Sequence, residues 1–144
     1  LNSTIISNSK LNWVKPPNWL ESKGSSMRVA SYSIPYSEGY GDLSVIELGG
    51  NGGGIKMNVN RWRRQLSLDN HTLKQIENNL VSYTGSLGDF NVIEIKNTKL
   101  DTAFICSIIS HSEGTIFVKL ALNSKGISEV IKEFISFSSS INVN

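Results

Sequence analysis

Residues 48–68 combine a glycine-rich loop with a run of cations, two features that commonly bind anions. Five of the six residues from Gly49 to Gly54 are glycine, which lets a backbone or a ligand approach closely. Guanidinium groups and the free N–H groups at a helix start both attract negative charge. We therefore predict an anion or partner site formed by Gly50, Gly52, Gly53, Gly54, Lys56, Arg61, Arg63 and Arg64.

The loop matches neither of two known phosphate-binding motifs. A P-loop requires lysine and then serine or threonine after its last glycine, where this sequence has Ile55 and Lys56. The dinucleotide fingerprint requires a third glycine, which does not follow Gly50 and Gly52 at the necessary position. The arginines also lie about one to two turns beyond the helix start, which argues against one compact phosphate site. The alternative interpretation of the cations is the solvated side of an amphipathic helix.

The residue types that commonly carry catalysis form no known signature here. Neither His71 nor His111 belongs to a metalloprotease, serine-hydrolase or cysteine–histidine motif, and we expect His111 at a surface turn. The single cysteine, Cys106, cannot form an internal disulfide or a cysteine zinc cluster. Its apolar neighbours predict a buried, inert thiol. We therefore predict no catalytic residue, no metal and no cofactor.

Two pairs of carboxylates remain as candidates for general acid–base chemistry. Asp42 could meet Glu47, and Asp101 could meet Glu113, although nothing in their spacing demands it. Isolated acids are usually solvated. A small enzyme or anion binder that uses the glycine loop and the arginines is accordingly the alternative to a binding domain.

The segment WVKPPNW places Trp13 and Trp19 on either side of adjacent prolines. The prolines favour an extended backbone and exclude a regular helix between the indoles. One interpretation is an N-terminal arm that packs both tryptophans onto the domain. The other is an aromatic contact surface at Trp13 and Trp19, since exposed indoles are uncommon without a partner.

The apolar patterns predict an α+β protein in which helices flank an antiparallel sheet. After the glycine loop, an amphipathic helix is expected to bury Trp62 within a stripe of Ile55, Val59, Trp62 and Leu66. Pro35 is expected to end the first strand of the sheet, and residues 102–109 are apolar on both faces, as in a central strand. The predicted strands are 27–34, 43–48, 81–84, 90–96, 102–109 and 115–122, and the predicted helices begin near 55, 72 and 127.

Length and composition favour one globular domain. The chain has 144 residues with 39% hydrophobic side chains, and we predict a flexible tether at residues 1–12 and a single domain at 13–144.

A net charge of +2 is too small to imply a nucleic-acid partner. No apolar run approaches the length of a membrane span. The sequence begins at Leu1 without a methionine, and a cleaved upstream signal peptide or lipid anchor would fit that beginning.

Five segments follow one another in a recognisable order: WVKPPNW at 13–19, MRVASYSIP at 27–35, GDLSVIELGG at 41–50, NVNRWRRQL at 58–66 and a strand-to-helix segment at 116–137. In this order they resemble bacterial proteins of the PsbP-like superfamily, many of which are secreted or lipid-anchored. The resemblance implies an α/β/α sandwich without known catalytic residues. Other members are accessory subunits of photosystem II or a Ran-binding import factor, but no functional motif of either matches this sequence.

Together these patterns predict a non-enzymatic accessory or binding domain. The resemblance implies export to the periplasm or cell envelope, with a membrane tether through an upstream segment. The expected partner is another protein or an acidic surface, and no nucleic acid.

Overall fold

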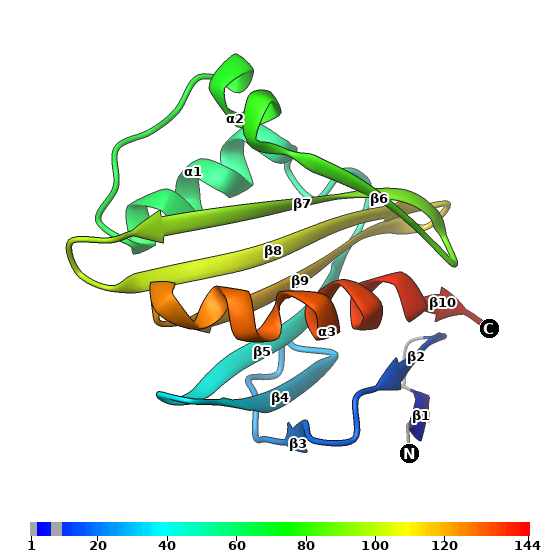
Figure 1. Ribbon diagram of the computed structural model, residues 1–144. Helices are drawn as coiled ribbons and strands as arrows, with labels where there is room; N and C mark the ends of the chain where they lie inside the picture. The colour runs from blue at the N-terminus through cyan, green and yellow to red at the C-terminus, as the bar shows by residue number, and fades with distance from the viewer. Residues whose placement is uncertain (1–2, 7–9) are drawn as a thin grey trace.

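A seven-stranded antiparallel sheet organises the protein, and helices cover both of its faces (Figure 1). The structure is a computed structural model that describes residues 3–6 and 10–144. In spatial order the strands are β3 (Leu20–Glu21), β4 (Ala30–Tyr36), β5 (Gly39–Leu48), β9 (Gly114–Leu122), β8 (Thr102–His111), β7 (Gly88–Asn97) and β6 (Val81–Gly85). Every neighbouring pair is antiparallel, so the predicted α+β class is confirmed.

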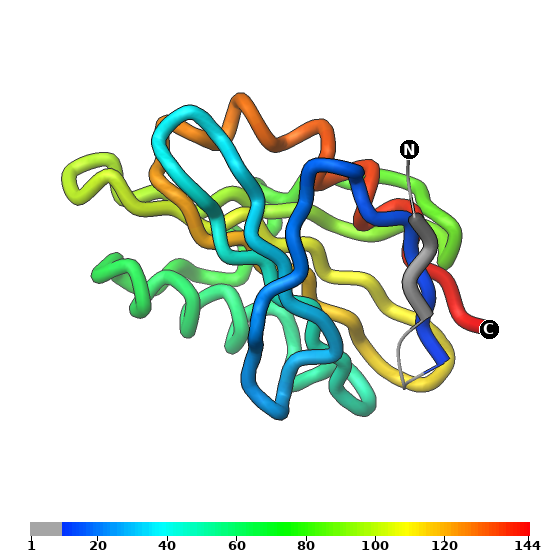
Figure 2. Tube along the Cα trace, turned by 90° about the horizontal axis from the view of Figure 1, so that it is seen from below, coloured from blue at the N-terminus to red at the C-terminus, as the bar shows by residue number. Residues whose placement is uncertain are grey.

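The helices form two outer layers. Both views place α1 (Ile55–Gln65) on one side of the sheet and α3 (Ile127–Ser140) on the other (Figures 1 and 2). The short α2 (Leu73–Asn79) lies on the α1 side, and a 3-10 turn at Ser124–Gly126 leads into α3. The predicted arrangement of helices around the sheet is therefore confirmed. Within the described ranges, the helices are too short or too polar to cross a membrane.

The larger core lies between the sheet and α3. Its centre is a group of aromatic rings in which Trp19 contacts Phe137 at 4.8 Å and Tyr32 at 5.9 Å between ring centroids. The Trp13 ring lies 6.1 Å from Phe137, and its Nε1 donates a hydrogen bond to the Tyr32 hydroxyl at 2.9 Å. These contacts hold the N-terminal segment against α3 and β4.

The smaller core lies between the sheet and α1. The predicted stripe on α1 faces this core, and Val59, Trp62 and Leu66 are buried there. The Trp62 ring meets Phe117 of β9 edge to face, with centroids 5.7 Å apart. On α2, the Thr72 side chain and Gln75 complete the predicted capping box.

Strand β8 passes between the two cores. Phe104 and Cys106 face α1, whereas Ile105 faces α3. The prediction of a central strand covered on both faces is confirmed, and Cys106 is fully buried.

Near the N-terminus, β2 (Leu11–Lys15) pairs with both β1 (Ser3–Ile6) and β10 (Asn142–Val143). Figure 2 shows β2 beside the C-terminal end of the chain. Leu11 is buried in the larger core, so the folded structure begins before the predicted boundary at residue 12. The other part of the predicted tether, residues 1–2 and 7–9, lies outside the described residues.

Pro35 does not end its strand as predicted. It lies inside β4 and is opposite Tyr40 of β5. The neighbouring β3 pairs only with Tyr32 and Ser33, so β4 is an edge strand at Pro35. A residue without a backbone N–H is tolerated at such an edge.

Candidate functional site

The glycine loop between β5 and α1 uses its own N–H groups to build a tight turn. Gly52 donates to the Gly49 carbonyl at 3.2 Å, and Gly54 donates to the Asn51 carbonyl at 3.0 Å. Gly53 donates to the side-chain oxygen of Asn51 at 3.0 Å. These three N–H groups therefore have partners within the loop.

The loop is also fixed to the sheet, and Gly52 lies directly against it. Its φ is +64°, and a Cβ there would lie 2.7 Å from a ring carbon of Phe117. Thr115 donates to the Gly50 carbonyl at 2.8 Å, while Asn58 donates to the Gly52 carbonyl at 2.9 Å. Two of the predicted site glycines, Gly50 and Gly52, thus contact the sheet or α1.

A shallow groove of about 550 Å³ runs between the start of α1 and the start of α2, and we call it the α1–α2 groove. No side chain caps Gly54 at the start of α1, and the first turn contains no acid. The groove is lined by Gly53, Gly54, Ile55, Lys56, Met57, Asn60, Arg64, Asn70 and Leu73. It brings together four of the eight predicted loop and helix residues.

The wall of the groove is held by contacts between α1 and the segment that leads to α2. Asn60 accepts from the His71 N–H at 2.8 Å and donates to the His71 carbonyl at 3.0 Å. Arg64 donates to the Asn70 side chain at 3.0 Å. Arg63 donates to the Asp69 carbonyl at 2.6 Å, and partial burial lowers its pKa. Arg63 consequently binds the segment that connects α1 to α2, and it does not line the groove.

Arg61 lies on the opposite flank of α1. There it lines a separate cleft over β5 and β9 that also contains Arg28 and Lys119. We call it the β5–β9 cleft. The structure therefore divides the predicted cluster of arginines between two sites.

The four cations of α1 lack the usual acidic partners. The sequence of this helix contains no aspartate or glutamate. Among the described residues, the ion pairs join Arg28 to Asp42, Lys96 to Glu94 and His111 to Glu47. Lys56, Arg61, Arg63 and Arg64 take part in none of them, and although Asp69 lies near Arg63, positive charge predominates on this helix.

The structure contradicts the predicted aromatic contact surface at Trp13 and Trp19. Both indoles are 1% exposed, because they pack against Tyr32 and Phe137 in the larger core. The other interpretation, an arm that packs its tryptophans onto the domain, describes what is observed.

The candidate acid–base pairs do not form. Asp42 binds Arg28, and Asp101 accepts hydrogen bonds from Asn123 and Ser124. Glu47 lies 2.8 Å from Nε2 of His111. The His111 side chain is only 3% exposed, so it is not the surface histidine that we expected.

No three His, Cys, Asp or Glu side chains in the described ranges lie close enough together to hold a metal ion. Burial raises the pKa of Cys106, which disfavours its nucleophilic thiolate form.

Sequence analysis did not identify several of the residues that line the α1–α2 groove and the β5–β9 cleft. Met57, Leu73 and Asn70 join the groove only because α2 folds back beside α1. Arg28 comes from the segment before β4, and Lys119 comes from β9. Lys119 did carry a signal, since it is a charged residue on a strand face otherwise occupied by Phe117 and Ala121.

Comparison with known proteins establishes the fold. No family model and no curated protein matches the sequence. A crystal structure from Bacteroides thetaiotaomicron is similar, with a TM-score of 0.61 and 11% identity over 98% of this chain and 48% of that chain. Cyanobacterial PsbP (CyanoP) from Synechocystis sp. PCC 6803 has a TM-score of 0.57 and 15% identity over 97% of this chain and 94% of that chain.

The present chain therefore spans about half the length of the Bacteroides protein and nearly all of the cyanobacterial one. The PsbP-like fold implied by the sequence motifs is confirmed. At such low identity the likeness concerns the fold and not the activity.

Proposed function

We propose that this chain is a non-enzymatic binding domain of an accessory protein and that its α1–α2 groove binds an acidic segment of a partner protein. The observation that carries the proposal is the predominance of positive charge on α1, with Lys56 and Arg64 lining the groove. Cations without acidic neighbours attract acidic partners and speed their association.

Apolar side chains beside these cations favour a protein segment over a simple anion. Met57 is 52% exposed and Leu73 is 42% exposed, and both line the groove. A small inorganic ion would use the charges alone. A peptide that carries an apolar side chain among its acids would contact both kinds of group.

The geometry of the glycine loop supports recognition by side chains. Because Gly52, Gly53 and Gly54 donate their N–H groups within the loop, those groups are not available to cradle a phosphate. Exposed lysine and arginine side chains give broader contacts, which weaken as salt screens them.

We further propose that the domain acts in the periplasm or cell envelope, as the resemblance of its motifs implies. Fractionation of cells that express the complete gene tests this location. Recovery of the protein only with cytoplasmic markers would contradict it.

The binding experiment is fluorescence anisotropy with a labelled peptide of Asp, Glu and Leu residues. The test variant is Lys56→Glu/Arg64→Glu, and the control is Lys132→Glu, an exposed cation of α3 on the opposite face. We expect the test variant to lose at least about tenfold in affinity, the equivalent of about 1.4 kcal/mol, and the control to bind as the wild type does.

Raising the salt should weaken the wild-type complex more than that of the test variant. If the test and control variants bind the peptide with equal affinity and have unchanged stability, the cations of α1 do not contribute to binding and only form the solvated face of the helix. Stronger binding to phosphatidylglycerol vesicles than to the peptide would make a membrane surface the partner and overturn the proposal.

A further inference from the structure

The β5–β9 cleft is a second concave site, distinct from the α1–α2 groove. Its volume of about 310 Å³ lies at the lower end of the range for small-molecule sites, about 300–1,000 Å³. The segment before β4 contributes Arg28, α1 contributes Arg61 and Trp62, and β5 and β9 contribute Ile46, Phe117 and Lys119. Residues from four separate parts of the chain thus converge on one space.

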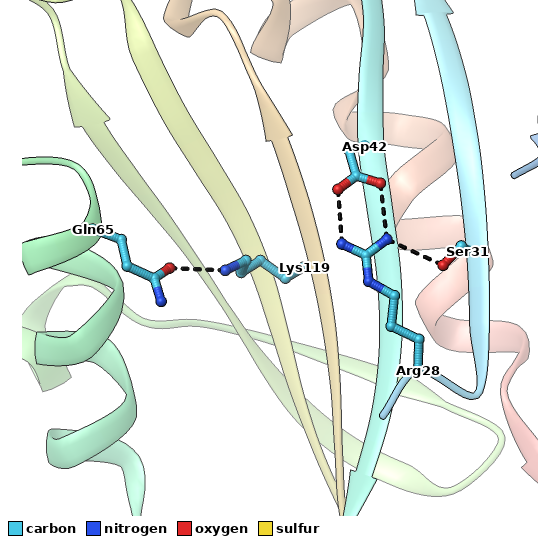
Figure 3. A network of polar contacts seen from close by, with 5 residues as sticks. All are labelled: Arg28, Ser31, Asp42, Gln65 and Lys119. Atoms are coloured by element: carbon cyan, nitrogen blue, oxygen red, sulfur yellow. Dashed lines mark hydrogen bonds and ion pairs between the residues drawn. The ribbon is translucent and has the colours of Figure 1, made fainter. Parts of the chain in front are cut away.

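Positive charge predominates in this cleft. Arg28 is neutralised by Asp42, which accepts two hydrogen bonds from its guanidinium at 3.0 and 2.8 Å (Figure 3). Arg61 and Lys119 take part in none of the ion pairs between described residues. The cleft therefore holds two cations that form no ion pair among the described residues, although the Asp42 carboxylate is close enough to Lys119 to favour its charged form.

Lys119 is the more constrained of these two cations. Figure 3 shows its side chain directed toward α1, where Nζ donates to Gln65 at 2.9 Å. Nζ also lies 4.3 Å from the centre of the Phe104 ring. Burial, and to a lesser degree Arg61 and Arg28, lowers the pKa of Lys119, and Asp42 offsets only part of this effect. A bound anion would offset both the burial and the repulsion.

The rest of the lining is largely apolar. Trp62 and Phe117 form part of the lining together with Ile46, and Met27 is 64% exposed beside them. Ser44, which is opposite Lys119 in the sheet, adds a hydroxyl group. A few convergent polar groups on an apolar floor are typical of sites for small organic ligands.

We propose that this cleft binds a small organic carboxylate with an apolar body. The carboxylate lies between Arg61 and Lys119, and the apolar body rests on Ile46 and Phe117. This site and its ligand are separate from the acidic partner assigned to the α1–α2 groove.

Isothermal titration calorimetry with octanoate tests the proposal. Octylammonium, which has the same number of carbons and the opposite charge, and inorganic phosphate, which has no apolar body, serve as comparison ligands. We expect octanoate to bind at millimolar concentration or below, and the other two to bind at least about tenfold more weakly. Absence of octanoate binding, or equal binding of octylammonium, would overturn the proposal.

Variants locate the site. Arg61→Gln changes an exposed side chain, so it should leave the fold intact and weaken octanoate binding by about tenfold. Lys119→Gln should do the same, with its folding checked by circular dichroism. Arg64→Gln, on the other flank of the same helix, is the matched control and should bind octanoate normally. Unchanged binding by Arg61→Gln, or an equal loss in Arg64→Gln, would contradict the assignment.

Discussion

Trp62 is the side chain that joins the basic helix to the sheet. It is 2% exposed and contacts Phe117 edge to face. Replacing it with alanine would leave a large cavity, so we predict that Trp62→Ala lowers the free energy of unfolding by about 3–5 kcal/mol. Chemical denaturation measures this loss. A loss below about 1 kcal/mol would mean that the surrounding core does not depend on this indole.

The Arg28–Asp42 pair makes stability depend on pH. The hydrogen bond from Arg28 is the main cause that lowers the pKa of Asp42 below its ordinary value of 3.8. A lowered carboxyl pKa stabilises the fold above the ordinary value, and this contribution is lost as the pH falls through the folded value.

Because the Asp42 side chain is 56% exposed, the contribution should be below about 1 kcal/mol. We predict that Asp42→Asn is slightly less stable than the wild type at pH 7 and that the difference is smaller at a pH well below the ordinary value of 3.8. Urea denaturation at both pH values measures it. The same difference at both pH values would show that the ionised carboxylate is not its source.

The loop that leads into α1 is constrained at particular glycines. Gly52 has a positive φ and meets Phe117, whereas a Cβ at Gly49 would meet nothing within 4 Å. We predict that Gly52→Ala destabilises the fold by at least about 1–2 kcal/mol, the cost of the left-handed conformation alone. Gly49→Ala is the matched control and should cost less. Thermal unfolding compares them, and equal losses would contradict the role assigned to Gly52.

Local elements could be predicted from the sequence because their signals are local. The apolar stripe predicted which face of α1 is buried, and Thr72 predicted the capping box at the start of α2. Pro35 was misjudged because the sequence does not show which strand lies at an edge. The tryptophans of the N-terminal segment were left with two interpretations, since only tertiary packing brings them to Phe137.

The candidate sites were harder to predict than the elements that carry them. Arg61 and Arg64 are three residues apart and belong to the same helix, yet they line different sites. The division depends on α2 on one flank and on β5 and β9 on the other. Neither neighbour can be inferred from the sequence of α1 itself.

At the scale of the whole molecule, the two faces of the sheet are covered unequally. The larger core extends from β4 to β7 beneath α3. On the sheet, the buried side chains of the smaller core come from β7, β8 and β9, and β5 contributes only the partly buried Leu48. The α1 face thus leaves room over β5 for the β5–β9 cleft, and the other flank of α1 forms the α1–α2 groove.

The central claim is that the α1–α2 groove docks an acidic segment of a protein, and crosslinking in the source cells tests it most directly. A photoreactive residue replaces Met57 in the groove or, as a control, Lys132 on α3 in the full-length protein. The account predicts that position 57 crosslinks to a partner protein through an acidic peptide, and that Lys56→Glu/Arg64→Glu removes this product. The same product from position 132, or its persistence in the charge-reversed variant, would contradict the account.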